Sequence, residues 1–342
     1  MAPQQYAKDQ PEGFKNVIEN VAIVGAGGQM GGYLAKHLLA TGKHKVTAIT
    51  RADSVTKLPD GLRVAKVDYS NSLTIVDALR GQDALLITLG VFVPPDTQAK
   101  LINAAIEAGV SWIMPNDWGT DSTNDDLAKD TMLTDARWQA RDLIEQAGLG
   151  RVSLVCGFWY EYSLAGAAVR YGFDFKNRSV VFYDDGNTKI NTSTWDQVGR
   201  TVAKLMSMKI LPEDAEDTST TTLSRFRNQF VYISSFLVSQ KDMFASVLRV
   251  TGTTEADWTI TYEDAHERYK TGVSELQSGN VNGFPKLLYA RLFYRNGGGD
   301  YESVKGTSNE ILGLPKEDLD DRTKAAIDMA TEGSRMTRTR DP

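Results

Sequence analysis

A glycine-rich turn near the start of the chain constrains the fold more than any other feature. Gly25, Gly28 and Gly31 recur at every third residue, directly after the short apolar run 20–24. The first glycine permits a tight strand-to-helix turn, the second lets backbone approach a pyrophosphate, and the third lets the helix pack closely on a sheet. The strict G-x-G-x-x-G form is not met, because Met30 stands at its last position. The turn therefore predicts a dinucleotide-binding unit whose helix N-terminus faces the phosphates.

Apolar runs and helical patterns alternate regularly through the first half of the chain. Predicted strands cover residues 20–24, 45–50, 63–67, 84–89, 111–114 and 152–155. Predicted helices cover 30–41, 72–79, 97–108 and 131–147. Six strands that alternate with helices indicate a Rossmann-type, doubly wound α/β fold, whose parallel sheet is covered on both faces.

The pattern changes after Cys156, where a stretch dense in aromatic residues begins. The Asp-Gly step at 185–186 predicts a hairpin over 180–186, and a helix over 194–206 and a strand over 230–235 follow. We expect a smaller C-terminal α+β substrate domain. The predicted parts are an N-terminal arm (1–17), a dinucleotide-binding domain (18–157, completed by parts of 187–238), a substrate-binding region (158–330) and a disordered tail (331–342).

The composition limits the binding partners and the cellular compartment that we expect for this protein. The net charge of −6 gives no electrostatic case for binding nucleic acid or an anionic membrane surface. No apolar run approaches the roughly 20 residues that span a bilayer, and the polar N-terminus predicts neither a signal nor a transit peptide. The single cysteine and the three scattered histidines predict no disulfide and no metal site. We therefore expect a cytoplasmic protein with a small-molecule substrate, and a homo-oligomer stays open.

The residue that ends the second predicted strand bears on the choice of dinucleotide. An acidic residue there would bind the ribose 2′-hydroxyl of NAD, whereas an arginine suits a 2′-phosphate. Arg51 stands at this position, and Lys57 follows six residues later. Since a guanidinium forks onto phosphate oxygens, the sequence favours NADP(H) over NAD(H) as the cofactor.

Several short segments together resemble the NmrA-like and isoflavone reductase-like family of atypical short-chain dehydrogenases, especially its fungal members. The resemblance spans roughly residues 18–265. The segments that carry it are the glycine turn 25–31, Arg51, 67–69, 73–79, 81–84, 115–119, 157–162 and 195–199.

The resemblance implies an NADP(H) domain and a C-terminal region that closes a substrate pocket over the nicotinamide. Asp68 and Tyr69 would lie near the adenine, and Phe158 and Trp159 near the nicotinamide. The full set of implied or inferred cofactor contacts is Gly25, Gly27, Gly28, Gln29, Met30, Arg51, Lys57, Asp68, Tyr69, Thr88, Leu89, Gly90, Val91, Asn116, Arg137 and Phe158.

The chain departs from this family at the lysine that its reductases carry on the helix before the sixth strand. Counting back from Gly148 without a gap places Arg137 there, whereas a slip of two residues places Gln139. An arginine stays protonated, so it cannot shuttle a proton, but it can hold a carbonyl or a developing anion.

Candidate proton donors lie elsewhere in the sequence. They are Asp117, Tyr160, Tyr162 and His266, with Tyr160 preferred, so the predicted catalytic residues are Arg137, Tyr160 and Asp117. The one Tyr-x-x-x-Lys string, at 301–305, lies far past the predicted sheet, and we interpret it as a chance match.

Three functional hypotheses follow from the residues and the resemblance. The first is an NADP(H)-dependent oxidoreductase that acts on a small, largely apolar substrate in fungal secondary metabolism, by imine or enone reduction. The second is an NADP(H)-bound cyclase in which a redox step sets up ring closure. The third is a non-catalytic NADP-sensing regulator of the NmrA-like kind.

Overall fold

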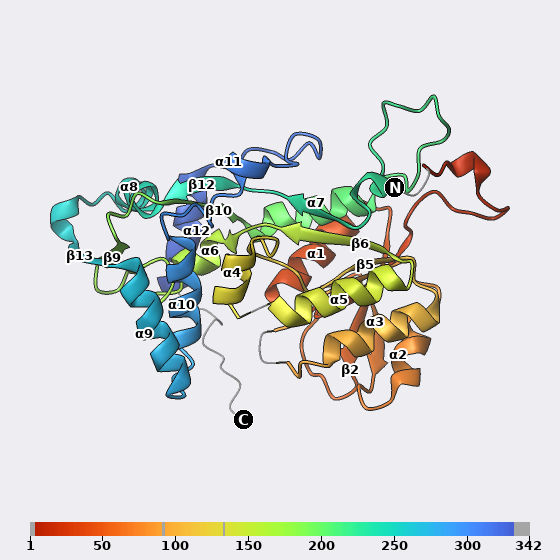
Figure 1. Cartoon of the computed structure of the whole chain (residues 1–342), viewed down its shortest axis with the longest axis horizontal. Helices are drawn as coiled ribbons and strands as arrows, with labels where there is room; N and C mark the ends of the chain where they lie inside the picture. Colours follow the sequence, from red (N-terminus) through yellow and green to blue (C-terminus); the bar gives the residue numbers. More distant parts are fainter. Residues whose placement is uncertain (1–3, 91–92, 133, 332–342) are drawn as a thin grey trace.

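A seven-stranded parallel sheet forms one half of the molecule (Figure 1). This computed structural model describes residues 4–90, 93–132 and 134–331, without the side chains of 134–136. The strands of the sheet are β1 (Asn20–Val24), β2 (Lys45–Arg51), β3 (Arg63–Val67), β4 (Ala84–Ile87), β5 (Trp112–Met114), β6 (Gly150–Val155) and β11 (Gln229–Tyr232). Their order is β11-β6-β5-β4-β1-β2-β3, so the strand order reverses between β1 and β4. The fold is therefore the doubly wound α/β type that the alternating pattern predicts.

Helices cover both faces of this sheet because its strands are apolar on both sides. The helices are α1 (Gln29–Ala40) and α7 (Trp195–Met206) on one face, and α2 (Ser72–Leu79), α3 (Thr97–Ala108) and α5 (Thr134–Gln146) on the other. Val21 and Ile23 of β1 join the core under α1, while Ala22 and Val24 join the core under α2 and α3. Successive side chains of a strand point to opposite faces, which accounts for the continuous apolar run.

One predicted strand in this half needs correction, and one helix was not predicted. The strand expected at 230–235 is shorter, and it pairs with β6 as a seventh strand of the parallel sheet, with Val231 opposite Leu154. The helix expected over 131–147 is confirmed as α5, and a helix that was not predicted, α4 (Asp125–Asp130), precedes it. Met132, with a φ of +57°, interrupts the right-handed helical backbone between them.

Two small sheets and a helical layer form the C-terminal part (Figure 1). Their strands are β7 (Phe158–Trp159), β8 (Phe173–Asp174), β9 (Ser179–Tyr183), β10 (Lys189–Ser193), β12 (Phe236–Ser239) and β13 (Thr259–Glu263). The helices are α6 (Tyr160–Leu164), α8 (Gln240–Thr251), α9 (Ala265–Gln277), α10 (Gly283–Leu292), α11 (Glu302–Lys305) and α12 (Leu319–Thr331). Three 3-10 turns, Ala7–Asp9, Leu223–Phe226 and Glu255–Asp257, complete the described elements.

The hairpin predicted over 180–186 is wrong, although its Asp-Gly turn is present. Gly186 donates a backbone hydrogen bond of 2.9 Å to Tyr183, which closes the turn. The strands on either side nevertheless enter different sheets, in the orders β13-β9-β8 and β12-β10-β7. Because β8 and β13 occupy both edges of β9, no edge remains for β10.

The N-terminal arm packs along the segment that follows α7. Ala7 donates its backbone N–H to Pro212, and Asn16 donates its side-chain amide to the carbonyl of Leu211 at 2.8 Å. Among the helices within residues 4–331, none is long and apolar enough to cross a bilayer.

Candidate active site

The glycine turn packs so tightly that side chains are excluded from two of its positions. Gly25 has a φ of +84°, and a Cβ atom there would lie 2.1 Å from the carbonyl oxygen of Thr88 at the end of β4. A Cβ at Gly31 would lie 2.2 Å from the carbonyl oxygen of Gly25. Gly28 closes the turn with a backbone hydrogen bond of 2.8 Å to Gly25. The close approach of turn, helix and sheet predicted from the spacing is confirmed.

The outer side of the same turn is open. Gly27, Gly28 and Gln29 are exposed, and α1 begins at Gln29 with Gly28 as its N-cap. The first N–H groups of a helix have no partner within it and lie at the positive end of its dipole. This exposed backbone cradle, without side chains to obstruct it, fits the pyrophosphate of a dinucleotide.

The loop after β2 lies beside this cradle. Arg51 is 55% exposed, and its Nε lies 3.5 Å from a carboxylate oxygen of Asp53. Thr56 comes so close that a Cβ at Gly27 would lie 2.5 Å from its methyl carbon. Arg51 and the exposed Lys57 therefore flank the glycine turn as two solvent-facing cations.

Two residues predicted near the adenine follow β3. The Asp68 carboxylate accepts hydrogen bonds from the backbone N–H and the hydroxyl of Ser70, which lower its pKa. Tyr69 is half-buried, and burial raises the pKa of its hydroxyl while Arg51 opposes that rise.

A side-chain amide joins the ends of β4 and β5 at the carboxyl edge of the sheet. Asn116 accepts from the backbone N–H of Leu89 at 2.9 Å and donates to the carbonyl of the same residue at 3.2 Å. Thr88 binds back to Val24 through its hydroxyl, and Gly90 is exposed. Val91, another predicted cofactor contact, lies outside the described residues.

Next to Asn116, a buried carboxylate pairs with two arginines of α5. Asp117 Oδ2 accepts a 3.0 Å hydrogen bond from Arg141 Nε, and Asp117 Oδ1 lies 3.5 Å from Arg137 Nε. Ser122 accepts from Arg141 and lies 3.4 Å from Asp117 Oδ1. The side chains of Asp117, Arg137 and Arg141 are 4%, 12% and 3% exposed. We call Asp117, Ser122, Arg137 and Arg141 the arginine cluster.

Aromatic rings and a thiol enclose the arginine cluster. The Arg141 guanidinium lies between the rings of Trp138 and Phe230, at 4.7 and 4.6 Å from their centroids. Burial lowers the pKa of Arg137, which Asp117 partly offsets, and the group stays a cation because arginine starts from a very high pKa. Burial raises the pKa of the Cys156 thiol to about 12, so this neighbour carries no charge at neutral pH.

The two residues that could stand at the family's lysine position lie in different surroundings. Arg137 faces Asp117, whereas Gln139 is exposed. Arg141 and Ser122 were not predicted as site residues. The only sequence signal for Arg141 is its spacing of four from Arg137, which places both on one helical face.

The predicted proton donor Tyr160 lies in a different environment. It is fully buried, and its hydroxyl is 2.7 Å from the hydroxyl of Thr323 on α12. Burial raises the pKa of Tyr160 far above its ordinary value. Phe158 is half-buried, and its ring centroid lies 4.1 Å from that of Tyr289. The placement of Tyr160 favours a packing role, while Phe158 remains a candidate for a pocket wall.

The other predicted donors are also engaged with neighbouring rings. The rings of Tyr162, Trp159 and Trp195 form a triangle, with centroids 5.9 to 6.2 Å apart. His266 stacks on Tyr294 at 3.8 Å. These aromatic contacts give the C-terminal side of the site a largely apolar character.

The Tyr-x-x-x-Lys string ties α11 to the sheet. Tyr301 donates its hydroxyl to the carbonyl of Ile233, which leaves that proton engaged. Lys305 Nζ lies 2.6 Å from Asp121 and 3.0 Å from the hydroxyl of Tyr232. Tyr301 and Lys305 therefore hold α11 against the sheet, in keeping with the interpretation of the string as a chance match.

A buried carboxyl that the sequence did not single out lies on α6. Burial raises the pKa of Glu161 from its ordinary value to about 7, and its nearest cation is Arg322, at 3.7 Å. Asp196 and Glu317 also face it, and repulsion from both carboxylates contributes to the rise. One oxygen of Glu161 has no hydrogen-bond partner among the described residues.

We expect Glu161 to make stability depend on pH between about pH 4.5 and 7. The folded protein binds this proton more tightly than the unfolded chain, so the free energy of unfolding falls as pH rises through that interval. The fall is about 3 kcal/mol and is absent in Glu161→Gln. Urea unfolding of both proteins at several pH values measures it. Burial lowers the pKa of His44, so His44 makes the free energy of unfolding rise with pH. Because both proteins contain His44, subtracting one curve from the other cancels this contribution. Parallel curves for the two proteins would contradict the assignment.

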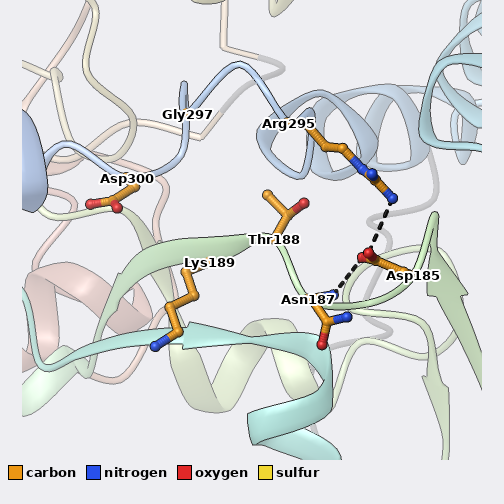
Figure 2. Close-up of a pocket in the computed structure, with 7 residues that line it drawn as sticks. All are labelled: Asp185, Asn187, Thr188, Lys189, Arg295, Gly297 and Asp300. Atoms are coloured by element: carbon orange, nitrogen blue, oxygen red, sulfur yellow. Dashed lines mark hydrogen bonds and ion pairs between the residues drawn. The ribbon is translucent and has the colours of Figure 1, made fainter.

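A shallow hollow lies in the C-terminal part, apart from the predicted site residues. Its walls come from the β9–β10 turn and the loop after α10, and Figure 2 shows Arg295 reaching toward Asp185 across it. Arg295 Nη2 lies 3.1 Å from Asp185 Oδ2, so the charges there are compensated.

Comparison with known proteins places this geometry in context. Residues 25–152 match a family model described as NAD(P)H-binding. Over 310 residues the chain is 29% identical to the oxidoreductase aprR of Aspergillus flavus, covering 88% of this chain and 96% of that protein.

Solved structures share the fold at lower sequence identity. AtPrR2 with NADP+ and (+)pinoresinol has a TM-score of 0.70 at 18% identity, covering 91% of this chain and 99% of that chain. Isoflavone reductase has a TM-score of 0.69 at 19% identity, covering 90% and 99%. The resemblance to isoflavone reductase-like proteins is thus confirmed for the fold.

Proposed function

We propose that this protein is an NADP(H)-dependent oxidoreductase for a small, largely apolar organic substrate. The proposal is supported by the match of residues 25–152 to an NAD(P)H-binding family model and by the isoflavone reductase fold of the chain. The observation that carries the proposal is the open backbone cradle at Gly27 and Gly28, with the buried arginine cluster at the same edge of the sheet. In open α/β sheets, ligands bind at this carboxyl edge, where the strand order reverses.

The residues present fit the cofactor in three places. The glycine turn would hold the pyrophosphate, Arg51 and Lys57 the 2′-phosphate, and the β4 end near Leu89 the remainder of the dinucleotide. When bound, the cofactor supplies or accepts a hydride. The protein positions the partners and excludes water, and Arg137 supplies a fixed positive charge.

Arg51 is expected to set the preference for the phosphorylated dinucleotide. Arg51→Ala removes a guanidinium that forks onto phosphate, so we expect the Kd for NADPH to rise about 10- to 100-fold while that for NADH changes little. Titration of protein fluorescence with each dinucleotide measures both constants. Arg80→Ala is the matched control, since Arg80 is an exposed arginine that pairs with Asp77. Equal affinity of the unaltered protein for NADPH and NADH would refute the preference.

The aromatic residues around Phe158 and Trp159 support an apolar substrate. The similarity to a fungal oxidoreductase over most of both chains supports a role in secondary metabolism. Oxidation of NADPH, followed at 340 nm with fractionated fungal metabolites, tests whether turnover occurs.

Two other functions predict different results. A cyclase would convert its substrate to a ring with or without net consumption of NADPH, and the permanent cation at Arg137 is the observation that favours it. A regulator would bind NADP(H), turn over no metabolite and capture a protein partner. Product analysis by mass spectrometry beside the 340 nm assay distinguishes all three.

A further inference from the structure

Strand β13 lies at the end of the sheet β13-β9-β8 and has one unoccupied edge. It pairs in parallel with β9, so the N–H of Thr259 donates to the carbonyl of Arg178 at 2.8 Å. Because backbone groups alternate in direction along a strand, residues 259, 261 and 263 face β9. Ile260 and Tyr262 therefore turn their N–H and C=O groups outward, where these groups have no hydrogen-bond partner in the part of the chain that the structure describes.

The edge of β13 lacks the charges that protect the comparable edge of β3. Both are five-residue strands at the end of a sheet. Strand β3 carries exposed Arg63 and Lys66, and charged side chains on an edge discourage the addition of further strands. Strand β13 reads Thr-Ile-Thr-Tyr before Glu263, whose carboxylate is engaged by Arg268. This uncharged segment of β-branched and aromatic residues is a template for another strand.

The edge of β13 is also accessible. Figure 1 shows β13 at the outer end of the C-terminal part, away from the seven-stranded sheet. Tyr262 is 62% exposed, although its ring centroid lies 5.6 Å from that of Phe182. Thr259 and Thr261 are exposed as well. A partner strand at this edge would therefore leave the nucleotide-binding half uncovered.

We propose that the edge of β13 pairs with the same edge of a second copy of the chain, antiparallel and about a two-fold axis at Thr261. This antiparallel register places Ile260 opposite Tyr262 of the second copy, so that every outward-facing residue meets another outward-facing residue. Each such pair exchanges both of its N–H···O=C bonds, and the two β13-β9-β8 sheets become one continuous sheet. A two-fold contact of this kind closes on itself and produces a dimer. The proposal does not depend on the reaction that the protein catalyses.

The side chains of β13 suit this self-pairing. Directly opposite residues of an antiparallel pair contact each other on one face of the sheet. The register matches isoleucine with tyrosine, an aromatic and β-branched pair, and threonine with threonine, and both kinds of pair are stabilising. Glu263, the charged member of the strand, faces Thr259 of the second copy, so no like charges oppose each other. The strand is thus complementary to itself in both hydrogen bonding and charge.

Sedimentation of the full chain tests the proposal, because Thr261 lies on the two-fold axis. From about 1 to 100 µM we expect a reversible equilibrium between monomer and dimer. Thr261→Lys places two lysines opposite each other and Thr261→Glu two glutamates, so each variant should raise the Kd of the dimer about 5-fold or more. An equal mixture of the two variants should recover association, because lysine then faces glutamate. Lost packing alone would not be rescued in this way.

Val64→Lys is the control, since it adds a lysine to the exposed edge strand of the other sheet. It should leave the Kd of the dimer unchanged. Hydrogen exchange followed at single amides of the unaltered protein gives a second measurement. The amides of Ile260 and Tyr262 should be protected only at concentrations where the dimer forms. The amides of Thr261 and Glu263 should be protected at every concentration, because they face β9.

Each outcome supports the proposal or overturns it. A monomer at every concentration overturns it, and so does a dimer that neither Thr261 variant weakens. A monomer with protected amides at Ile260 and Tyr262 would show that another segment of the same chain occupies the edge. A dimer without that protection would show that the copies meet elsewhere. If a Thr261 variant does not fold, the exchange pattern of the unaltered protein still decides, and none of these results bears on the binding of NADP(H).

Discussion

Replacing Gly31 with alanine is expected to remove most of the affinity for NADP(H). The new Cβ would lie 2.2 Å from the carbonyl oxygen of Gly25 and 2.9 Å from the Cα of Ala26, both backbone atoms of the turn. Backbone cannot rotate away as a side chain can, so the turn must move off the helix and the cradle opens. We expect the Kd for NADPH to rise roughly 10- to 100-fold, with a loss of about 1–3 kcal/mol in stability.

Gly32→Ala is the matched control for this substitution. It lies in the same helix one residue later, and its nearest neighbour would be the carbonyl oxygen of Ala26 at 3.7 Å, an ordinary contact. Because alanine is the better helix former, Gly32→Ala should retain NADPH binding and gain about 0.5–1 kcal/mol. Fluorescence titration and urea unfolding measure both variants. Similar NADPH constants for the two would show that close packing at Gly31 does not shape the cradle.

The second large effect is expected at Asp117. Asp117→Ala leaves Arg137 and Arg141 without their shared carboxylate, and an uncompensated buried charge costs about 3–5 kcal/mol. Denaturant unfolding should show this loss directly. Asp117→Asn keeps the shape and one acceptor, so we expect an intermediate loss.

Asp77→Ala serves as the control for the Asp117 variants, because the Asp77–Arg80 pair is exposed. Its loss should stay within about 1 kcal/mol, as for other surface pairs. Equal losses for Asp77→Ala and Asp117→Ala would mean that water or another group already balances the two arginines.

Periodicity was sufficient to predict the parallel sheet and most of its helices. Strands buried on both faces are apolar throughout, and the glycine turn between β1 and α1 has a strong local signature. Pairing between distant segments was not readable in the same way. The turn at 185–186 is locally typical of a hairpin, yet the strands beside it separate because each has other partners. Nothing in the sequence of the turn indicates that both edges of β9 are paired with β8 and β13.

The residues of the candidate site show the same contrast between local and distant signals. Gly25, Gly28 and Gly31 act through the backbone of one continuous segment, so their spacing identified them. Arg141 gains its role from Asp117, and Glu161 acquires its raised pKa from burial. These properties arise only when remote segments pack together.

The place of β11 has a consequence for how the chain is made. Val152 and Leu154 of β6 form an open edge until residues 229–232 arrive to pair with them. During synthesis, the nucleotide-binding half must therefore wait for more than seventy further residues, with an unpaired apolar strand exposed to aggregation. A fragment that ends near residue 160 should be insoluble, whereas one that continues past β11 should have its edge protected. Strand β11, which comes from the second half of the chain, thus completes the sheet of the nucleotide-binding half. Dividing the chain at one position therefore cannot separate the two halves.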